Sequence, residues 1–283
     1  MNKIAIVADT TQDLTFELGE KYGIKVIPYM VQMGDQHFRD QLDIDTRRFY
    51  ETMSQYEVLS TGIPPLQDVT NQLDHLVSEG YTQALVITSA SKLTGMRQLY
   101  EVVLQQYQGL ELTIFESRYV GSITGLLSIY AAQLRDQGHS VKEIYQSLEE
   151  KDQKGQILAL FRSLKYVIRG GRFNKYAGMI GTFLNINPLL TIKDSEVTIL
   201  KKARGKKKSF QTLVEAVKDK VKGAKSYYMV LFSGDNAEEI AALKDVLKEE
   251  IVNSALCIET ELSPVLGVHA GPQSVGVSIL ILD

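Results

Sequence analysis

Residues 85–97 have the pattern of a strand, a hydroxyl-rich loop and the first turn of a helix, a unit typical of α/β sheets. The run from Leu85 to Thr88 is apolar and partly β-branched, as in a strand buried within a sheet. Apolar residues then recur at helical spacing, at Leu99, Val102, Val103 and Tyr107. Free backbone N–H groups and the helix dipole meet Ser91 and Thr94 at the helix start, which suits a carboxylate or phosphate. Either these hydroxyls form an anion cradle, or Thr94 is only a helix cap.

The same alternation of strand and helix runs through the first half of the chain. We predict strands at 4–8, 25–30 and 112–115, and helices at 13–22, 46–55 and 121–134. Ser60 and Thr61 stand just ahead of a predicted helix start that contains Pro65. Because α/β sheets bind ligands at the carboxyl ends of their strands, these polar positions favour a shared pocket.

A second set of strands and helices follows Gly155. We predict strands at 157–161, 227–232, 256–261 and 275–282, a hairpin over 187–200, and helices at 176–184, 209–222 and 237–250. The charged segment 141–154 leads to Gly155, near which we place the junction between two α/β domains, 1–156 and 157–283.

Composition excludes several classes of protein. The 283 residues are 44% hydrophobic and 23% charged, as in a globular protein with a full core. The formal net charge of -3 gives no general attraction to nucleic acid or anionic membranes. Cys257 is the only cysteine and the four histidines are scattered, so we expect no disulfide and no metal site. The first apolar run ends at Asp9, too early for a signal peptide, and we expect a cytoplasmic protein.

Three further positions are candidates for binding chemistry. Arg172 follows two glycines and is either a bidentate clamp for an anion or a surface arginine. His269 stands between two glycines, where we expect a turn that holds a structural or a reactive histidine. Arg204 belongs to the basic run 201–208, either a solvated edge or a docking surface for an acidic or phosphate-bearing partner. Only Phe210 accompanies this run, which disfavours nucleic-acid binding.

Motifs along nearly the whole chain resemble those of the DegV family. In the first half they are Val7-Ala8-Asp9-Thr10-Thr11-Gln12-Asp13-Leu14, Ser60-Thr61-Gly62-Ile63-Pro64, Ser91-Lys92-Leu93-Thr94-Gly95 and Glu116-Ser117. In the second half they are Leu164 through Phe173, Asn187-Pro188-Leu189-Leu190, Lys202-Ala203-Arg204-Gly205-Lys206-Lys207 and Gly267-Val268-His269-Ala270-Gly271-Pro272. Each motif is weak alone, and eight in register are specific.

The resemblance implies an N-terminal three-layer α/β/α domain with a mainly parallel sheet, a C-terminal α/β domain, and a lipid tunnel at their interface. It implies one long-chain fatty acid as the ligand and no tightly bound cofactor. The chain would be the non-catalytic binding subunit of a bacterial fatty acid kinase. A separate dihydroxyacetone-kinase-like subunit, carrying ATP and Mg²⁺, would convert the presented carboxylate to acyl phosphate for phospholipid synthesis.

By motif position, the resemblance also assigns site residues. It assigns ligand binding to Ser60, Thr61, Ser91, Thr94, Gly95 and His269. It assigns presentation or partner contact to Arg172, Arg204 and His269, and it implies no metal site, no nucleic acid and at most transient membrane contact. Thr94 stands where the family usually has serine, so the hydroxyl is kept while an added methyl group narrows the site.

The residues leave two other functions open. One is a stand-alone enzyme acting on a small carboxylated or phosphorylated metabolite, with His269 as general acid or base and Arg172 as the anion clamp. The chain offers no evident nucleophile paired with a base for it. The other is a nucleic-acid-associated regulator that uses Lys201 to Lys208, which would bind DNA with a steep salt dependence.

Overall fold

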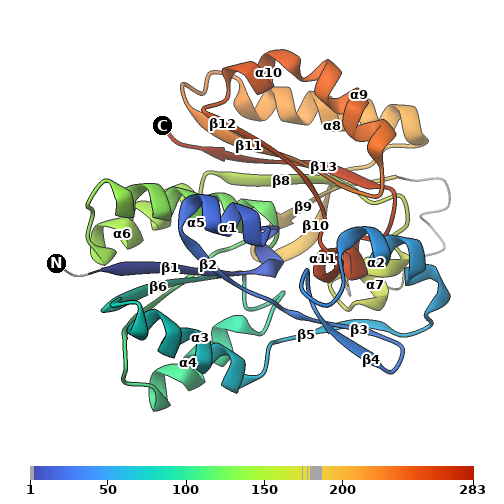
Figure 1. Cartoon of the computed structure of the whole chain (residues 1–283). Coiled ribbons are helices and arrows are strands. Elements are labelled where there is room, and N and C mark those ends of the chain that lie inside the picture. Colours follow the sequence, from blue (N-terminus) through green and yellow to red (C-terminus); the bar gives the residue numbers. More distant parts are fainter. Residues whose placement is uncertain (1–2, 174, 177, 179–186) are drawn as a thin grey trace.

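The computed structural model describes residues 3–283 apart from 174, 177 and 179–186, and its strands form three sheets (Figure 1). The helix predicted over 176–184 lies almost entirely outside the described residues. The first sheet is parallel throughout, in the order β2-β1-β6-β7. Its strands are β1 (Ile4–Asp9), β2 (Ile24–Ile27), β6 (Gln83–Thr88) and β7 (Glu111–Glu116).

Helices cover both faces of this parallel sheet, which confirms the predicted three layers (Figure 1). One face packs on α3 (Leu66–Ser78) and α4 (Met96–Gln106), and the other on α1 (Phe16–Tyr22) and α5 (Ser122–Asp136). Successive residues of each strand point to opposite faces of the sheet. Val7 and Val86 therefore face α3 and α4, whereas Ile6 and Leu85 face α5. α6 (Val141–Asp152) packs on α5 and begins at a capping box formed by Ser140 and Glu143.

A small antiparallel sheet, ordered β4-β3-β5, corrects the strand predicted over 25–30. That segment is two strands, since β2 ends at Ile27 and the next strand begins at Met30. Pro28 lies between them and has no N–H to donate to a ladder, which favours the break. The sheet consists of β3 (Met30–Met33), β4 (Gln36–Arg39) and β5 (Leu59–Gly62). Between β4 and β5 the chain forms α2 (Thr46–Thr52) and the 3-10 turn η2 (Met53–Gln55), and a further 3-10 turn, η1 (Thr10–Gln12), follows β1.

The third sheet is mixed, in the order β10-β9-β8-β13-β11-β12. The predicted hairpin is confirmed, with Asp194 and Ser195 both at positive φ in the turn between β9 and β10. The strands are β8 (Gly155–Leu160), β9 (Leu189–Lys193), β10 (Glu196–Lys201), β11 (Tyr227–Gly234), β12 (Leu256–Glu261) and β13 (Ser274–Ile281). Its outer face is covered by α8 (Lys206–Val221), α9 (Ala237–Val246) and α10 (Lys248–Asn253) (Figure 1).

Two short helices lie on the inner side of the third sheet, α7 (Lys165–Arg169) and α11 (Pro264–Ala270) (Figure 1). α11 corrects the prediction of a glycine turn around His269, because Pro264 is accommodated in the first turn and Gly271, at φ 74°, ends the helix. Val265 and Val268 of α11 join the core formed by α2, α3 and α4. A segment near the C-terminus therefore packs into the first half of the chain.

The proposed division into 1–156 and 157–283 stays a prediction, although β8 begins at Gly155, close to the expected junction. None of the described helices combines the length and the apolar character that crossing a bilayer requires. Among the described residues, no three His, Cys, Asp or Glu side chains are grouped so that they could hold a metal ion.

Candidate functional site

A cavity of about 880 Å³, part of which opens to solvent, lies between the first sheet and the inner side of the third. Most of its wall is apolar, and the apolar side chains come from β8, β9, β10, β11, α7, α11 and nearby loops. They are Leu93, Val120, Ile157, Ala159, Phe161, Val167, Leu190, Ile192, Val197, Phe232, Leu262, Val265, Leu266 and Ala270.

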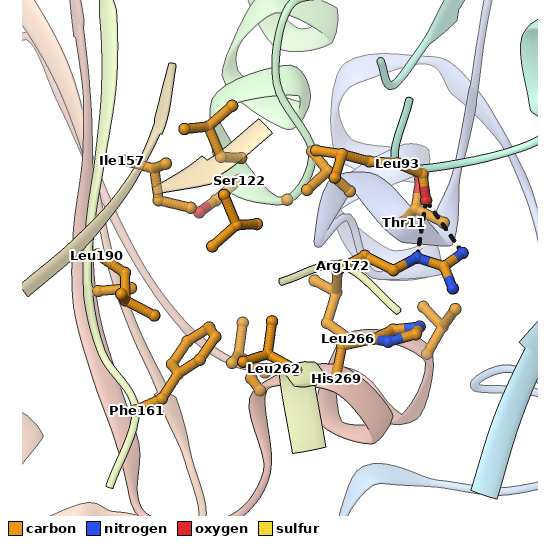
Figure 2. A pocket seen from close by; sticks show the side chains of 18 of the residues that line it. Thr11, Leu93, Ser122, Ile157, Phe161, Arg172, Leu190, Leu262, Leu266 and His269 are labelled. Carbon is orange, nitrogen blue, oxygen red and sulfur yellow. Dashed lines mark hydrogen bonds between the residues drawn. The ribbon is translucent and has the colours of Figure 1, made fainter. Parts of the chain in front are cut away.

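Polar groups gather at one side of the cavity, as Figure 2 shows for Arg172, His269 and Thr11. Ile157, Leu190 and Phe161 lie on the opposite side (Figure 2). The cavity is therefore amphipathic, with one hydrogen-bonding end and one apolar end.

Thr61 and His269 form the central contact of the polar end, although 208 positions separate them in the sequence. The Thr61 Oγ1 and His269 Nε2 atoms lie 3.0 Å apart. His269 Nδ1 is buried and has no partner among the described residues. A proton on Nδ1 would be a buried donor without an acceptor, so we assign the proton to Nε2, which donates it to Thr61. The hydroxyl hydrogen of Thr61 is then free to reach a ligand.

His269 stays neutral at physiological pH. Burial is the main cause that lowers its pKa to about 3, and the positive charges of Arg172 and Arg169 contribute to the same shift. A base this weak holds no proton at neutral pH and takes one from a substrate poorly. This disfavours the stand-alone enzyme that would use His269 as general acid or base.

Arg172 is fixed by carbonyl groups of the backbone. Its Nε and Nη2 atoms donate to the Leu93 carbonyl oxygen at 3.2 and 3.1 Å, and Nη1 donates to that of Gly170 at 2.6 Å. The dashed lines in Figure 2 mark the two bonds to Leu93. A guanidinium has five N–H donors, so two remain for a ligand or partner. The side chain links the loop before α4 to the segment after α7.

Thr94 lines the cavity beside Tyr29. Its hydroxyl donates to the Ser89 carbonyl oxygen at 3.5 Å, a long hydrogen bond that a ligand can replace. The Tyr29 hydroxyl accepts the Gly95 N–H at 3.2 Å, and burial raises the pKa of Tyr29, which keeps the phenol protonated. Thr94 is not a helix cap, because Gly95 occupies that position.

Three of the predicted ligand-binding residues do not line the cavity. Ser60 faces away from it and donates to Gln32 Oε1 at 2.8 Å. The Ser91 N–H donates to the Glu116 carboxylate at 2.8 Å, and the Gly95 N–H is taken by Tyr29. Of the predicted arginines, Arg204 is exposed just before α8 and does not line the cavity either.

Thr11, Tyr29, Ser122 and Thr191 line the cavity without having been predicted as site residues. Thr11 lies just after the end of β1, and a hydroxyl at the end of a strand could have identified it as a site residue. The sequence around Tyr29 and Ser122 contains no comparable indication. The Thr11 hydroxyl donates to Asp9 Oδ1 at 2.5 Å and lies 3.0 Å from Ser89 Oγ. Burial raises the pKa of Asp9 to about 6, although the hydrogen bonds that Asp9 accepts from Thr11 have the opposite effect and lower this pKa.

The fold and the cavity together define the class of protein: an α/β protein with an amphipathic cavity between its first and third sheets. The family model described as "Uncharacterised protein, DegV family" matches residues 3–282, and the chain belongs to this family. A DegV domain-containing protein of Clostridium acetobutylicum is 32% identical over 284 residues, with 99% of each chain covered.

Solved structures share the whole fold. A DegV family protein of Thermus thermophilus, described for its fatty acid binding, matches with a TM-score of 0.91 and 24% identity, over 99% of this chain and 100% of that one. DegV of Bacillus subtilis, described as a fatty acid binding protein, matches with a TM-score of 0.90 and 21% identity, again over 99% and 100%. These likenesses confirm the predicted α/β fold.

Proposed function

We propose that this chain binds one long-chain fatty acid, with the alkyl tail along the apolar wall and the carboxylate beside Thr61 and Thr94. The amphipathic division of the cavity is the observation that carries the proposal. Burying about sixteen carbons at roughly 0.8 kcal/mol per CH₂ supplies a large gross affinity. Part of it is lost to ordering the chain, and the buried carboxylate must be hydrogen-bonded.

The polar end supplies donors of the required kind. The hydroxyl of Thr61 is a neutral donor, and the hydroxyl of Thr94 becomes one when a ligand replaces its long hydrogen bond to Ser89. The two remaining N–H groups of Arg172 add charge-assisted donors. Because neutral donors hold much of the head group, its oxygen stays nucleophilic. The fatty acid binding described for the Thermus thermophilus and Bacillus subtilis structures supports the same ligand class.

The proposal extends to the transfer step. The bound carboxylate oxygen attacks the terminal phosphorus of ATP held with Mg²⁺ on a separate dihydroxyacetone-kinase-like subunit, the bond to ADP breaks, and acyl phosphate forms. Arg204 and Lys206 to Lys208 are exposed at the start of α8 and give this subunit or its nucleotide a cationic surface to meet. A reaction that uses ATP and feeds phospholipid synthesis belongs to the cytoplasm.

Mass spectrometry of an organic extract of the purified protein tests the binding step. We expect stoichiometric fatty acid, or full loading after incubation with palmitate. Ala159→Phe is the matched variant, because Ala159 lines the cavity on β8 and a phenyl ring there fills the space of the tail. Wild-type protein that carries no fatty acid and cannot be loaded contradicts the proposal.

A further inference from the structure

Ser122 and Ser278 place a hydroxyl pair on the largely apolar side of the cavity, whose wall also includes Thr191 of β9. Ser122 is the first residue of α5 and lines the cavity, and its Oγ lies 2.8 Å from Ser278 Oγ. Ser278 pairs with Ile157 across β13 and β8. The hydroxyl pair therefore lies near Ile157, across the cavity from Arg172 and His269 (Figure 2).

The hydrogens of this pair can be counted. Two hydroxyls carry two hydrogens, and their mutual bond uses one; no other hydrogen bond of either hydroxyl occurs among the described residues. If Ser122 donated, the hydrogen of Ser278 would remain unpaired in a fully buried place, at 0% exposure. Ser278 is therefore the donor, and the hydrogen of Ser122 is free on the cavity side.

The start of α5 strengthens this donor. Its N-cap, Gly121, also lines the cavity and offers no side-chain cap. The N–H groups of Ser122 and Ile123 have no hydrogen-bond acceptor among the described residues. The positive end of the α5 dipole lies beside the Ser122 hydroxyl and adds to its attraction for electronegative atoms. This part of the cavity wall therefore favours an oxygen that accepts hydrogen bonds.

We propose that Ser122 makes the cavity selective for fatty acids that carry an oxygen, as a hydroxyl or keto group, on the alkyl chain away from the carboxylate. This inference rests on the proposed function and names its substrate class. A plain alkyl chain leaves the Ser122 hydrogen unpaired, whereas an oxygen at the matching depth accepts it. An oxygen that meets apolar wall instead loses its hydration without return.

Calorimetric titration with stearate and a series of positional hydroxystearates and ketostearates tests the inference. We expect one position, in both series, to bind at least as tightly as stearate. In Ser122→Ala, the affinity of that isomer relative to stearate falls about fivefold to tenfold, the usual effect of one hydrogen bond. Ser278→Ala is the matched control, which keeps the preference because it keeps the Ser122 hydroxyl.

The outcomes are distinguishable. If stearate binds, and every isomer binds more weakly by factors that Ser122→Ala leaves unchanged, the selectivity is overturned and the proposed function stands. If neither stearate nor any isomer binds the wild-type protein, both are overturned.

Discussion

Ser60 and Thr61 are neighbours in β5, yet only Thr61 reaches the cavity, because successive side chains of a strand point to opposite faces. The hydroxyl-bearing residues around the site are therefore not equivalent. Thr61 has a hydroxyl hydrogen to give and that of Thr94 makes only a long, replaceable hydrogen bond, whereas that of Thr11 is already given to Asp9. Whether a hydroxyl group in this site can bind a ligand depends more on its hydrogen-bond partners than on whether the residue is serine or threonine.

Thr94→Val replaces a hydroxyl with a methyl group of similar size, so the wall keeps its shape and loses one donor. We expect the affinity for palmitate to fall about tenfold, which is roughly 1.4 kcal/mol. Titration calorimetry measures it. Ser60→Ala is the control and should bind as the wild type does, because Ser60 contacts Gln32 instead of the cavity. Unchanged binding by Thr94→Val would remove Thr94 from the carboxylate site.

Arg204→Ala separates binding from transfer. Arg204 is exposed and does not line the cavity, so we expect palmitate affinity within twofold of wild type. Loss of the guanidinium removes a donor for the partner subunit or its nucleotide, and we expect acyl phosphate formation with that subunit to fall tenfold or more. Lys222→Ala, at the other end of α8, is the matched control. Equal turnover in Arg204→Ala and wild type would contradict the presentation role.

Among the elements, α11 matters most, because it carries His269 into the first half of the chain and packs closely on α7. Tyr50 donates to the Leu262 carbonyl oxygen just before α11, and Asp40 accepts the Val265 N–H in its first turn at 3.2 Å. Side chains from α2 and from the residue after β4 thus fix a helix of the C-terminal part. The orientation of His269 follows from this packing.

Gly170→Ala tests how tightly α7 and α11 fit. Gly170 has ordinary helical φ and ψ, so alanine does not strain the backbone, but its Cβ would lie 2.1 Å from His269 Nδ1. We expect the ring to be displaced and palmitate binding to weaken at least tenfold. In a His269→Ala background the added methyl group finds room, so the further loss from Gly170→Ala should vanish. Additive losses in this double-mutant cycle would show that the two residues act separately.

For the molecule as a whole, three buried acids set the dependence of stability on pH. Burial raises the pKa of Asp13 to about 8, of Asp40 to about 7 and of Asp9 to about 6. One oxygen of each carboxyl group has no partner among the described residues. The folded protein keeps protons that the unfolded chain releases above about pH 4, so these groups lower stability as pH rises toward 8.

His269 acts in the opposite direction at lower pH. Its pKa is lowered to about 3, so the unfolded chain takes up a proton that the folded protein refuses as pH falls below about 6.5. Between pH 6.5 and 8 the acids dominate, because His269 is mostly neutral in the folded and the unfolded chain. There we expect the free energy of unfolding in urea to fall by roughly 2 kcal/mol, and Asp13→Asn to remove more than half of that fall. A flat profile over this interval would contradict the raised pKa values.

Much of the architecture was predictable because it rests on local patterns. The apolar run at 85–88, the turn at Asp194 and Ser195, and the alternation of strands and helices each reflect the spacing of a few adjacent residues. Predictions failed where packing overrode the local pattern. The glycines around His269 suggested a turn, and the structure has a helix there because α2, α7 and β5 surround it.

By itself, the sequence determined the kinds of element, their order and the α/β class, because helical and strand periods are properties of neighbouring residues. Only the tertiary structure decided which polar groups meet. Thr61 reaches His269 and Ser122 reaches Ser278 across 208 and 156 positions. Such pairs depend on how sheets and helices pack, and no period along the chain encodes a contact made by packing.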